Sequence, residues 1–193
     1  MQQPDALPLV IFSHGKETGP WGTKIRRLAE VAKAAGWQVI SVDYAVLTAQ
    51  LDAPAELRLQ ALLQFLATGL PPHSQLALVG SSMGGWVSAQ AACIGVVRLA
   101  GLFLLAPALG IASYPSQWPD VDPRIDIEIT HGWADDVIPV QNSIAFAQRT
   151  NARLNVVPDD HRLSQSLDVL CANFAAFLTR ISSTAASRNP AAP

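Results

Sequence analysis

A pentapeptide of the form G-x-S-x-G constrains the fold of this chain more than any other feature. It reads Gly80-Ser81-Ser82-Met83-Gly84, follows the apolar run Leu76–Val79 and leads into a segment with helical character from Gly85. A serine on a sharp strand-to-helix turn projects its hydroxyl above the sheet edge, and the flanking glycines leave room for the crowded backbone. The N-terminus of the following helix favours negative charge beside that hydroxyl. A glycine-rich turn between a core strand and a core helix is the alternative, but the motif makes Ser82 the candidate nucleophile.

The composition indicates one globular domain of ordinary size. Of the 193 residues, 50% are hydrophobic and 15% are charged, and the formal net charge is -2. These values argue against a disordered chain, and the lack of a basic excess argues against nucleic acid as a partner. The N-terminus has no basic region, and the apolar run Leu9–Phe12 is too short for a signal peptide or a membrane span. We therefore expect a cytoplasmic protein.

Apolar runs and helical periodicities alternate along the chain. We expect strands at 9–13, 37–44, 76–79, 100–105, 125–131 and 154–157, and helices at 23–35, 54–67, 85–92, 140–149 and from Leu163 to Ile181. The alternation predicts a three-layer, doubly wound α/β fold with a mostly parallel six-stranded sheet. The domain would span residues 1–181, and the Ser- and Ala-rich segment 182–193 would be a flexible tail. Cys93 and Cys171 lie among apolar residues of expected helices, which predicts buried free thiols.

Polar residues follow these strands at the end where parallel sheets bind their ligands. His14 and Gly15 follow the first strand, Asp43 the second, Ser82 the third, Asp135 and Asp136 the fifth, and His161 the sixth. A random scatter of polar residues would not produce this agreement. We therefore expect the functional site at the carboxyl edge of the sheet.

His161 is the candidate general base among the four histidines. It follows the acidic pair, on a loop that leads into the last helix, and would take the proton of Ser82 and return it to the leaving group. His73 lies in a polar loop at the opposite end of the sheet, and we expect it to be an ordinary surface residue. His14 and His131 each precede a glycine at a strand end, where an imidazole commonly orders loop backbone, so we expect structural roles for both.

The chain resembles the α/β-hydrolase superfamily from Leu9 to about Ile181, on the basis of these residues and of the segments around them. The matching segments are Ser13-His14-Gly15, Gly80 to Gly85, His131 to Pro139, and Asp160-His161-Arg162. Nucleophile, acid and histidine in this chain order are typical of the superfamily. The sequence begins directly at the superfamily's third strand, and the segment 107–124 is too short for a cap domain. The resemblance therefore implies a minimal α/β-hydrolase fold with little or no lid.

The resemblance also implies roles for individual residues. Asp135 and Asp136 are both candidates for the acid, and the superfamily motif H-G-x-x-D places the carboxylate that orients His161 at Asp135. Asp136 would then be a solvated neighbour or a cap for the following helix. The backbone N–H groups of Met83 and Lys16 would form the oxyanion hole.

Three aromatic residues near these loops are candidates for the substrate pocket: Trp21, Trp118 and Trp133. The sequence thus predicts a serine hydrolase that cleaves small carboxylic esters through an acyl-enzyme. We expect no metal or cofactor, because no group of His, Cys and carboxylate residues has ligand spacing. A thioesterase or acyl transferase with the same three residues is one alternative. A non-catalytic binding or scaffold protein with a hydrolase-like fold is the other.

Overall fold

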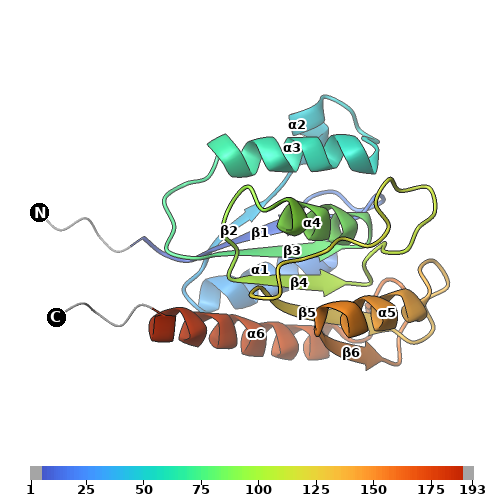
Figure 1. Ribbon diagram of the computed structural model, residues 1–193. Coiled ribbons are helices and arrows are strands. Elements are labelled where there is room, and N and C mark those ends of the chain that lie inside the picture. The colour runs from blue at the N-terminus through green and yellow to red at the C-terminus, as the bar shows by residue number, and fades with distance from the viewer. Residues whose placement is uncertain (1–5, 189–193) are drawn as a thin grey trace, which may run out of the picture.

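The computed structural model describes residues 6–188, with side chains from residue 6 to residue 183. Its strands are β1 (Leu9–Ser13), β2 (Gln38–Ser41), β3 (Leu76–Ser81), β4 (Gly101–Leu105), β5 (Asp126–Gly132) and β6 (Arg153–Val157). They form a six-stranded sheet in the order β2-β1-β3-β4-β5-β6, in which every neighbouring pair is parallel (Figure 1). The expected α/β fold class is confirmed.

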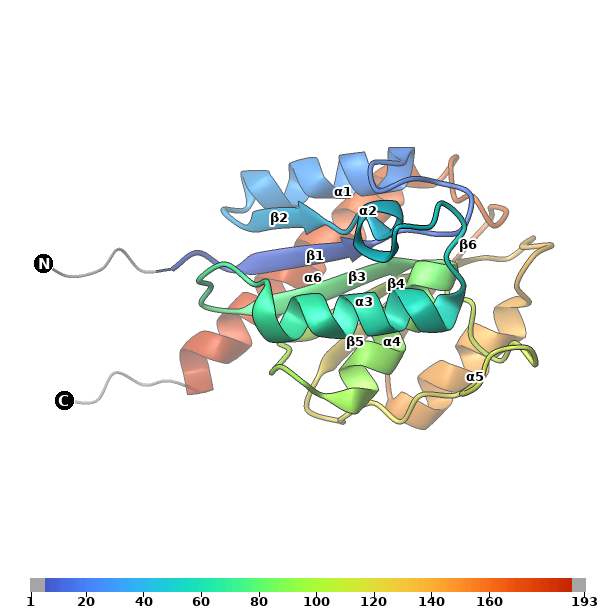
Figure 2. The same cartoon turned by 90° about the horizontal axis from the view of Figure 1, so that it is seen from above.

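Helices cover both faces of the sheet, which makes the fold three-layered. The helices are α1 (Thr23–Ala34), α2 (Tyr44–Thr48), α3 (Ala55–Thr68), α4 (Met83–Ile94), α5 (Val140–Thr150) and α6 (Leu167–Arg188). Residues of α1 and α6 share one buried cluster with the sheet, and residues of α3, α4 and α5 share the other. In Figure 1, α3 and α4 lie on one side of the central strands and α6 lies on the other. In Figure 2, α3 lies in front of the strands and α6 behind them.

The central strands read as continuous apolar runs because both of their faces are buried. All five residues of β1 are buried, and they alternate between the two sides of the sheet. Leu9 and Ile11 belong to the cluster beneath α3 and α4, whereas Val10 and Phe12 belong to the cluster beneath α1 and α6. This pattern is typical of parallel sheets that are covered on both faces.

The structure corrects the expected bounds of two elements. The second strand ends at Ser41 rather than residue 44, because Tyr44 begins the short helix α2, whose N-cap Asp43 accepts a hydrogen bond from the Val46 N–H at 3.3 Å. The last helix begins at Leu167 rather than Leu163. It runs to Arg188, so residues 182–188, which we expected to belong to a tail, are helical. Residues 189–193 of that expected tail lie outside the described part of the chain.

The cysteines are less buried than the sequence indicates. Cys93 is exposed and Cys171 is half-buried, and both are free thiols. Cys93 lies in the last turn of α4 next to Ile94, which is itself 51% exposed. This last turn therefore extends beyond the part of the sheet against which the helix packs. Between residues 6 and 188, no helix is both long and apolar enough to cross a membrane.

The winding direction of the sheet changes between β1 and β3. The chain passes from β1 to β2 on one side, and β3 then pairs with the other side of β1. Such a switch point opens a crevice at the carboxyl ends of the two strands, where ligands of doubly wound sheets bind. The fold therefore places the loop after Ser13 next to the turn that carries Ser82.

Candidate active site

Ser82 lies on the turn between β3 and α4 in a strained backbone conformation. Its φ and ψ angles are 54° and -120°, and a positive φ is uncommon for a residue other than glycine. The neighbouring glycines are required by close packing. A Cβ atom on Gly80 would lie 2.3 Å from the carbonyl oxygen of Gly84, and one on Gly84 would lie 2.1 Å from that of Ser13. The G-x-S-x-G pattern thus follows from how tightly α4 packs against the strand ends.

The structure brings Ser82, His161 and Asp135 together in one chain of hydrogen bonds. The imidazole Nε2 of His161 lies 3.0 Å from Ser82 Oγ, and its Nδ1 lies 2.7 Å from Asp135 Oδ2. Because an ionised carboxylate can only accept, Nδ1 carries the hydrogen and Nε2 is left to accept the serine hydroxyl. The imidazole is therefore held with its unprotonated nitrogen facing the Ser82 hydroxyl.

The carboxylate of Asp135 is fully buried and has several donors. Its Oδ1 accepts the backbone N–H groups of Val137 and Ile138 at 2.9 and 2.8 Å, and its Oδ2 is 3.0 Å from His131 Nε2 as well as bonded to His161. Burial opposes ionisation, but the hydrogen bonds from Ile138, His161 and Val137 outweigh it and hold the pKa of Asp135 below its ordinary value. Asp135 is therefore ionised at neutral pH.

The neighbouring Asp136 has a different environment. It is exposed, and His161 bonds to Asp135 instead. The N-cap residue of α5 is Pro139, without a side-chain cap, so Asp136 is a solvated neighbour and does not cap this helix.

His131 is buried between the end of β5 and helix α5. Its Nδ1 lies 2.7 Å from Ser143 Oγ, and its Nε2 lies 3.0 Å from the carbonyl oxygen of Ile138. Since that carbonyl can only accept, Nε2 carries the hydrogen and Nδ1 accepts the Ser143 hydroxyl. Burial lowers the pKa of His131, which keeps the ring neutral. Sequence reasoning did not anticipate that Oδ2 of Asp135 would contact a second imidazole.

Two residues that sequence reasoning left without a role hold the loop of His161. Asp159 accepts backbone N–H groups from Asp160, Gln165 and Ser166 at 2.8–2.9 Å, and it is buried. Lys24 of α1 donates from Nζ to the His161 carbonyl oxygen at 3.3 Å, and burial lowers the pKa of this ammonium to about 8. The contact of Lys24 joins residues 137 positions apart, so no local sequence signal could reveal it.

Two backbone segments lie close to Ser82. Met83 is the first residue of α4, and the N–H groups of a first helical turn have no acceptor within their own helix. The loop after β1 passes on the other side, since a Cβ atom on Gly15 would lie 3.3 Å from the Cβ of Ser82. The next peptide of that loop carries the N–H of Lys16.

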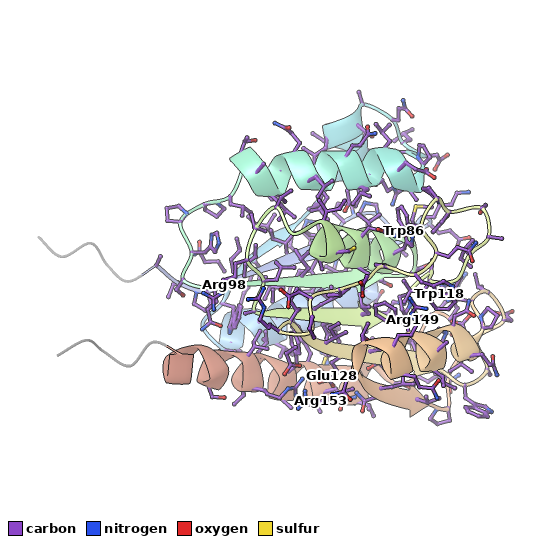
Figure 3. All side chains as sticks on the ribbon, viewed as in Figure 1. Trp86, Arg98, Trp118, Glu128, Arg149 and Arg153 are labelled. Atoms are coloured by element: carbon purple, nitrogen blue, oxygen red, sulfur yellow. The ribbon has the colours of Figure 1, made fainter. Side chains whose placement is uncertain are left out.

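The tryptophans expected near the pocket differ in their surroundings. Trp21 and Trp133 are 42% and 66% exposed, whereas Trp118 is half-buried and packs partly against the core. In Figure 3, Trp118 and Trp86 lie at the end of the sheet opposite to Arg98. Trp86 is buried and donates from its indole to the Ser116 carbonyl oxygen at 2.7 Å. It thus fixes the segment between β4 and β5 to α4.

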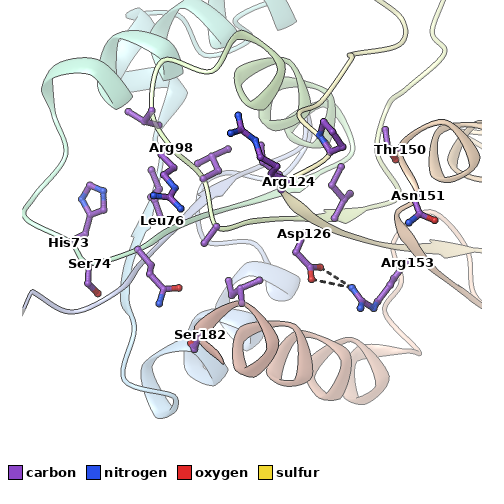
Figure 4. Close-up of a pocket in the computed structure, with 18 residues that line it drawn as sticks. His73, Ser74, Leu76, Arg98, Arg124, Asp126, Thr150, Asn151, Arg153 and Ser182 are labelled. Atoms are coloured by element: carbon purple, nitrogen blue, oxygen red, sulfur yellow. Dashed lines mark hydrogen bonds and ion pairs between the residues drawn. The ribbon is translucent and has the colours of Figure 1, made fainter. Parts of the chain in front are cut away.

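A wide hollow of about 1140 Å³ lies away from this site, at the amino end of the strands. Leu76 and Asp126, which begin β3 and β5, contribute to its lining together with Arg98 and Arg153 (Figure 4). The Arg153 guanidinium is bonded to Asp126 within this lining. None of the site residues expected from the sequence lines this hollow.

Known proteins resemble the chain in both sequence and structure. Residues 10–192 match the model of the alpha/beta hydrolase family. The structure of a protein of the alpha/beta hydrolase superfamily from Xanthomonas campestris pv. campestris has 33% sequence identity and a TM-score of 0.79, and the match covers 90% of this chain and 99% of that one. The comparison with curated proteins found no match.

More distant structures share the fold. Est1E from Butyrivibrio proteoclasticus has 20% identity and a TM-score of 0.76 over 93% of this chain and 90% of its own, and another structure of Est1E has ferulic acid bound. Dienelactone hydrolase from Anabaena variabilis has 18% identity and a TM-score of 0.74 over 91% and 87% of the two chains. The match of the family model over nearly the whole length, together with this architecture, shows that the chain belongs to the alpha/beta hydrolase family.

Proposed function

We propose that this protein is a serine hydrolase that cleaves small carboxylic esters through an acyl-enzyme on Ser82. The observation that carries the proposal is the continuous chain of hydrogen bonds from Ser82 through His161 to the buried carboxylate of Asp135. A nucleophile, a base and a group that orients the base are the recurring arrangement of nucleophilic acyl transfer. Family membership supports hydrolysis as the reaction class.

In the first half-reaction, Ser82 Oγ bonds to the ester carbonyl carbon while its proton passes to His161 Nε2. The carbonyl oxygen becomes an oxyanion, which the backbone N–H groups of Met83 and Lys16 would stabilise. The intermediate then collapses, the bond to the alkoxy group breaks, and the departing alcohol takes the proton from Nε2. The imidazolium formed in between is stabilised by the ionised Asp135.

In the second half-reaction, water takes the place of the alcohol. His161 removes a proton from the water, whose oxygen bonds to the acyl carbon, and the same two N–H groups receive the oxyanion. When this intermediate collapses, Ser82 Oγ leaves and regains its proton from Nε2. The carboxylic acid is released, and the three side chains return to their initial protonation states.

The segment between β4 and β5 supports a preference for small acyl groups. It contains no helix or strand within the described structure, and Trp86 and Gln90 of α4 both donate to the Ser116 carbonyl oxygen at 2.7 Å. A loop held down in this way does not enclose a long acyl chain as a helical lid would. We expect higher kcat/KM for acetate and butyrate esters than for long-chain esters, and the opposite order would reject this preference.

Labelling by a fluorophosphonate tests the nucleophile. The wild-type protein is expected to be labelled covalently, and Ser82→Ala is expected to abolish both labelling and ester hydrolysis. The adjacent Ser81→Ala is a matched control, because Ser81 belongs to the same pentapeptide but it is the hydroxyl of Ser82 that bonds to His161. Labelling that persists in Ser82→Ala would refute the proposal. A wild-type protein that is neither labelled nor active would instead favour a binding protein with a hydrolase fold.

A further inference from the structure

A buried guanidinium lies beneath the loop that follows β1. Arg58 of α3 is 1% exposed, and its Nη1 donates to the carbonyl oxygen of Gly15 at 3.1 Å and to that of His14 at 3.4 Å. Its Nε donates to the carbonyl oxygen of Ala53 at 2.9 Å. A side chain from a helix on the face of the sheet thus contacts the backbone beside Ser82 directly.

The guanidinium of Arg58 is not in contact with any carboxylate, and Asp52 acts on its charge only from a longer distance. Among residues 6–183, no carboxylate lies within 4.0 Å of its guanidinium, which instead contacts carbonyl oxygens and lies 5.2 Å from the ring centre of Tyr44. Burying a charge without a counter-ion in contact is expensive, and a neutral amide could donate hydrogen bonds at a lower cost. The guanidinium is held here mainly by the carbonyl oxygens of Ala53, His14 and Gly15.

The carbonyl of Gly15 receives a second donor from its own neighbour. His14 Nδ1 lies 2.7 Å from this oxygen, and because a carbonyl can only accept, Nδ1 carries the hydrogen. The ring is buried, packs against Tyr44 with 5.3 Å between the ring centres, and has a lowered pKa because of its burial, so it is neutral. Arg58 and His14 together fix the direction in which the Gly15 carbonyl points.

The fixed carbonyl also fixes the N–H group of the next residue. The C=O of Gly15 and the N–H of Lys16 belong to one planar trans peptide and point in opposite directions. Hydrogen bonds to the oxygen of an amide polarise the whole group, which makes its N–H a stronger donor. This peptide begins at Gly15, on which an added Cβ atom would lie 3.3 Å from the Cβ of Ser82.

We propose that Arg58 is a positioning residue for the oxyanion hole. Its guanidinium holds and polarises the Gly15–Lys16 peptide so that the Lys16 N–H meets the negative oxygen of the tetrahedral intermediate. This inference rests on the proposed serine hydrolase activity. His14 assists by donating to the same carbonyl.

Substitution of Arg58 tests this role through kcat and through a transition-state analogue. We expect Arg58→Met to lower kcat for a short-chain ester by about 10²-fold, the typical effect of losing one oxyanion donor, with KM changed little. Affinity for an aliphatic trifluoromethyl ketone, which forms a tetrahedral oxyanion adduct with serine, should fall by a similar factor. Arg58→Lys retains the charge and should recover part of both losses.

A second variant on α3 separates this role from a general loss of stability. Leu62 is fully buried on the same helix and belongs to the core, and its aliphatic side chain cannot donate to the loop carbonyls, so Leu62→Ala should destabilise the fold with little change in kcat of the folded fraction. Stability of each variant is measured by urea unfolding. If Arg58→Met does not fold, Arg58→Lys is compared with Arg58→Gln, which keeps a donor without the charge and should have the lower kcat.

An NMR measurement makes the proposal testable apart from turnover. The amide proton of Lys16 should shift upfield in Arg58→Gln relative to wild type, because its peptide is less polarised. If the wild-type protein shows no Ser82-dependent activity, the proposed function fails, while an unchanged Lys16 signal would refute the role of Arg58 by itself. Folded Arg58 variants with wild-type kcat and ketone affinity, or with losses no greater than that of Leu62→Ala, would also overturn it.

Discussion

The buried carboxylate of Asp135 illustrates how single residues define this site. One of its oxygens accepts two backbone N–H groups, and the other lies between the imidazoles of His161 and His131. This arrangement satisfies a buried charge and fixes the ring that faces Ser82. Asp136, the next residue in the chain, is exposed and has no part in it.

Asparagine substitutions distinguish these two acidic residues. We expect Asp135→Asn to lower kcat by about 10⁴-fold, because an amide at this position favours the wrong tautomer of His161 and cannot stabilise the imidazolium. Asp136→Asn is the matched control and should leave kcat within about twofold of wild type, since surface changes away from such contacts have small effects. Steady-state ester hydrolysis measures both. Equal losses in the two variants would contradict the assignment of Asp135.

At the scale of elements, the close packing of α4 against the end of β1 builds the site. A side chain larger than hydrogen at Gly84 would overlap the backbone of Ser13 and His14, because its Cβ would lie 2.1 and 2.7 Å from their carbonyl oxygens. These atoms belong to backbone and cannot move aside as a flexible side chain could. The position of the Ser82 turn relative to the loop after β1 thus depends on the absence of a Cβ.

Alanine substitutions of two glycines test this packing. We expect Gly84→Ala to lower the free energy of unfolding by at least about 2 kcal/mol, because overpacking at a backbone contact forces the helix away from the strand. Gly19→Ala is the control: no atom lies within 4 Å of the added Cβ, so its effect should stay within about 0.5 kcal/mol. Urea unfolding followed by circular dichroism measures both changes. A Gly84→Ala protein as stable as Gly19→Ala would show that the contact is not tight in solution.

For the molecule as a whole, an ionic network attaches the last helix, α6, to the sheet at strand β5. Arg180 of α6 bonds to Asp126 and Glu128 of β5 at 2.6–2.9 Å, and Arg153 of β6 bonds to Asp126 at 3.1 Å. Glu128 and Arg153 appear near α6 in Figure 3. Burial opposes ionisation of Asp126, but its bonds to Arg180 and Arg153 outweigh this effect and lower its pKa. This network stabilises the fold at a distance from the site.

The network predicts a dependence of stability on pH. The pKa of Asp126 is lower in the folded protein than its value of about 4 in the unfolded chain. The ionised carboxylate therefore adds to the free energy of unfolding above pH 4, and this stabilisation is lost as the pH falls through the folded pKa. At pH 7, Asp126→Asn should reduce the free energy of unfolding by about 1–2 kcal/mol, a range that allows for partial exposure of the group. The difference in the free energy of unfolding between Asp126→Asn and the wild-type protein should become smaller in acid. The kcat of the variant should equal that of the wild type.

The matched control for Asp126 is Asp168→Asn. Asp168 is almost fully exposed and lies 3.4 Å from Arg27, and such surface pairs contribute little. Urea unfolding at pH 7 and at pH 3 measures both variants. If Asp126→Asn were no less stable than Asp168→Asn at neutral pH, the network would have no role in attaching α6.

The fold could be predicted from the sequence to within a few residues at most element ends. The runs that became β1 and β4 are apolar and short, and the amphipathic segments that became α1 and α3 have clear helical periods. Helix α2 has only five residues and no period to detect. Leu163 follows the apolar period of α6 and is fully buried, but its φ of 55° places it in a loop before the helix. The prediction that Cys93 is buried was wrong, because apolar neighbours in the sequence do not show where a helix extends beyond the sheet that it covers.

The sequence alone determined the alternation of strands and helices, the turn at Ser82, and the placement of Asp135 and His161 at carboxyl ends of strands. Each follows from local periodicity and turn chemistry, which act over a few residues. Only the tertiary structure decided the contacts of Arg58 with His14, 44 positions away, and of His161 with Ser82, 79 positions away. These contacts depend on the switch in strand order between β1 and β3 and on side-chain packing, which no local pattern encodes.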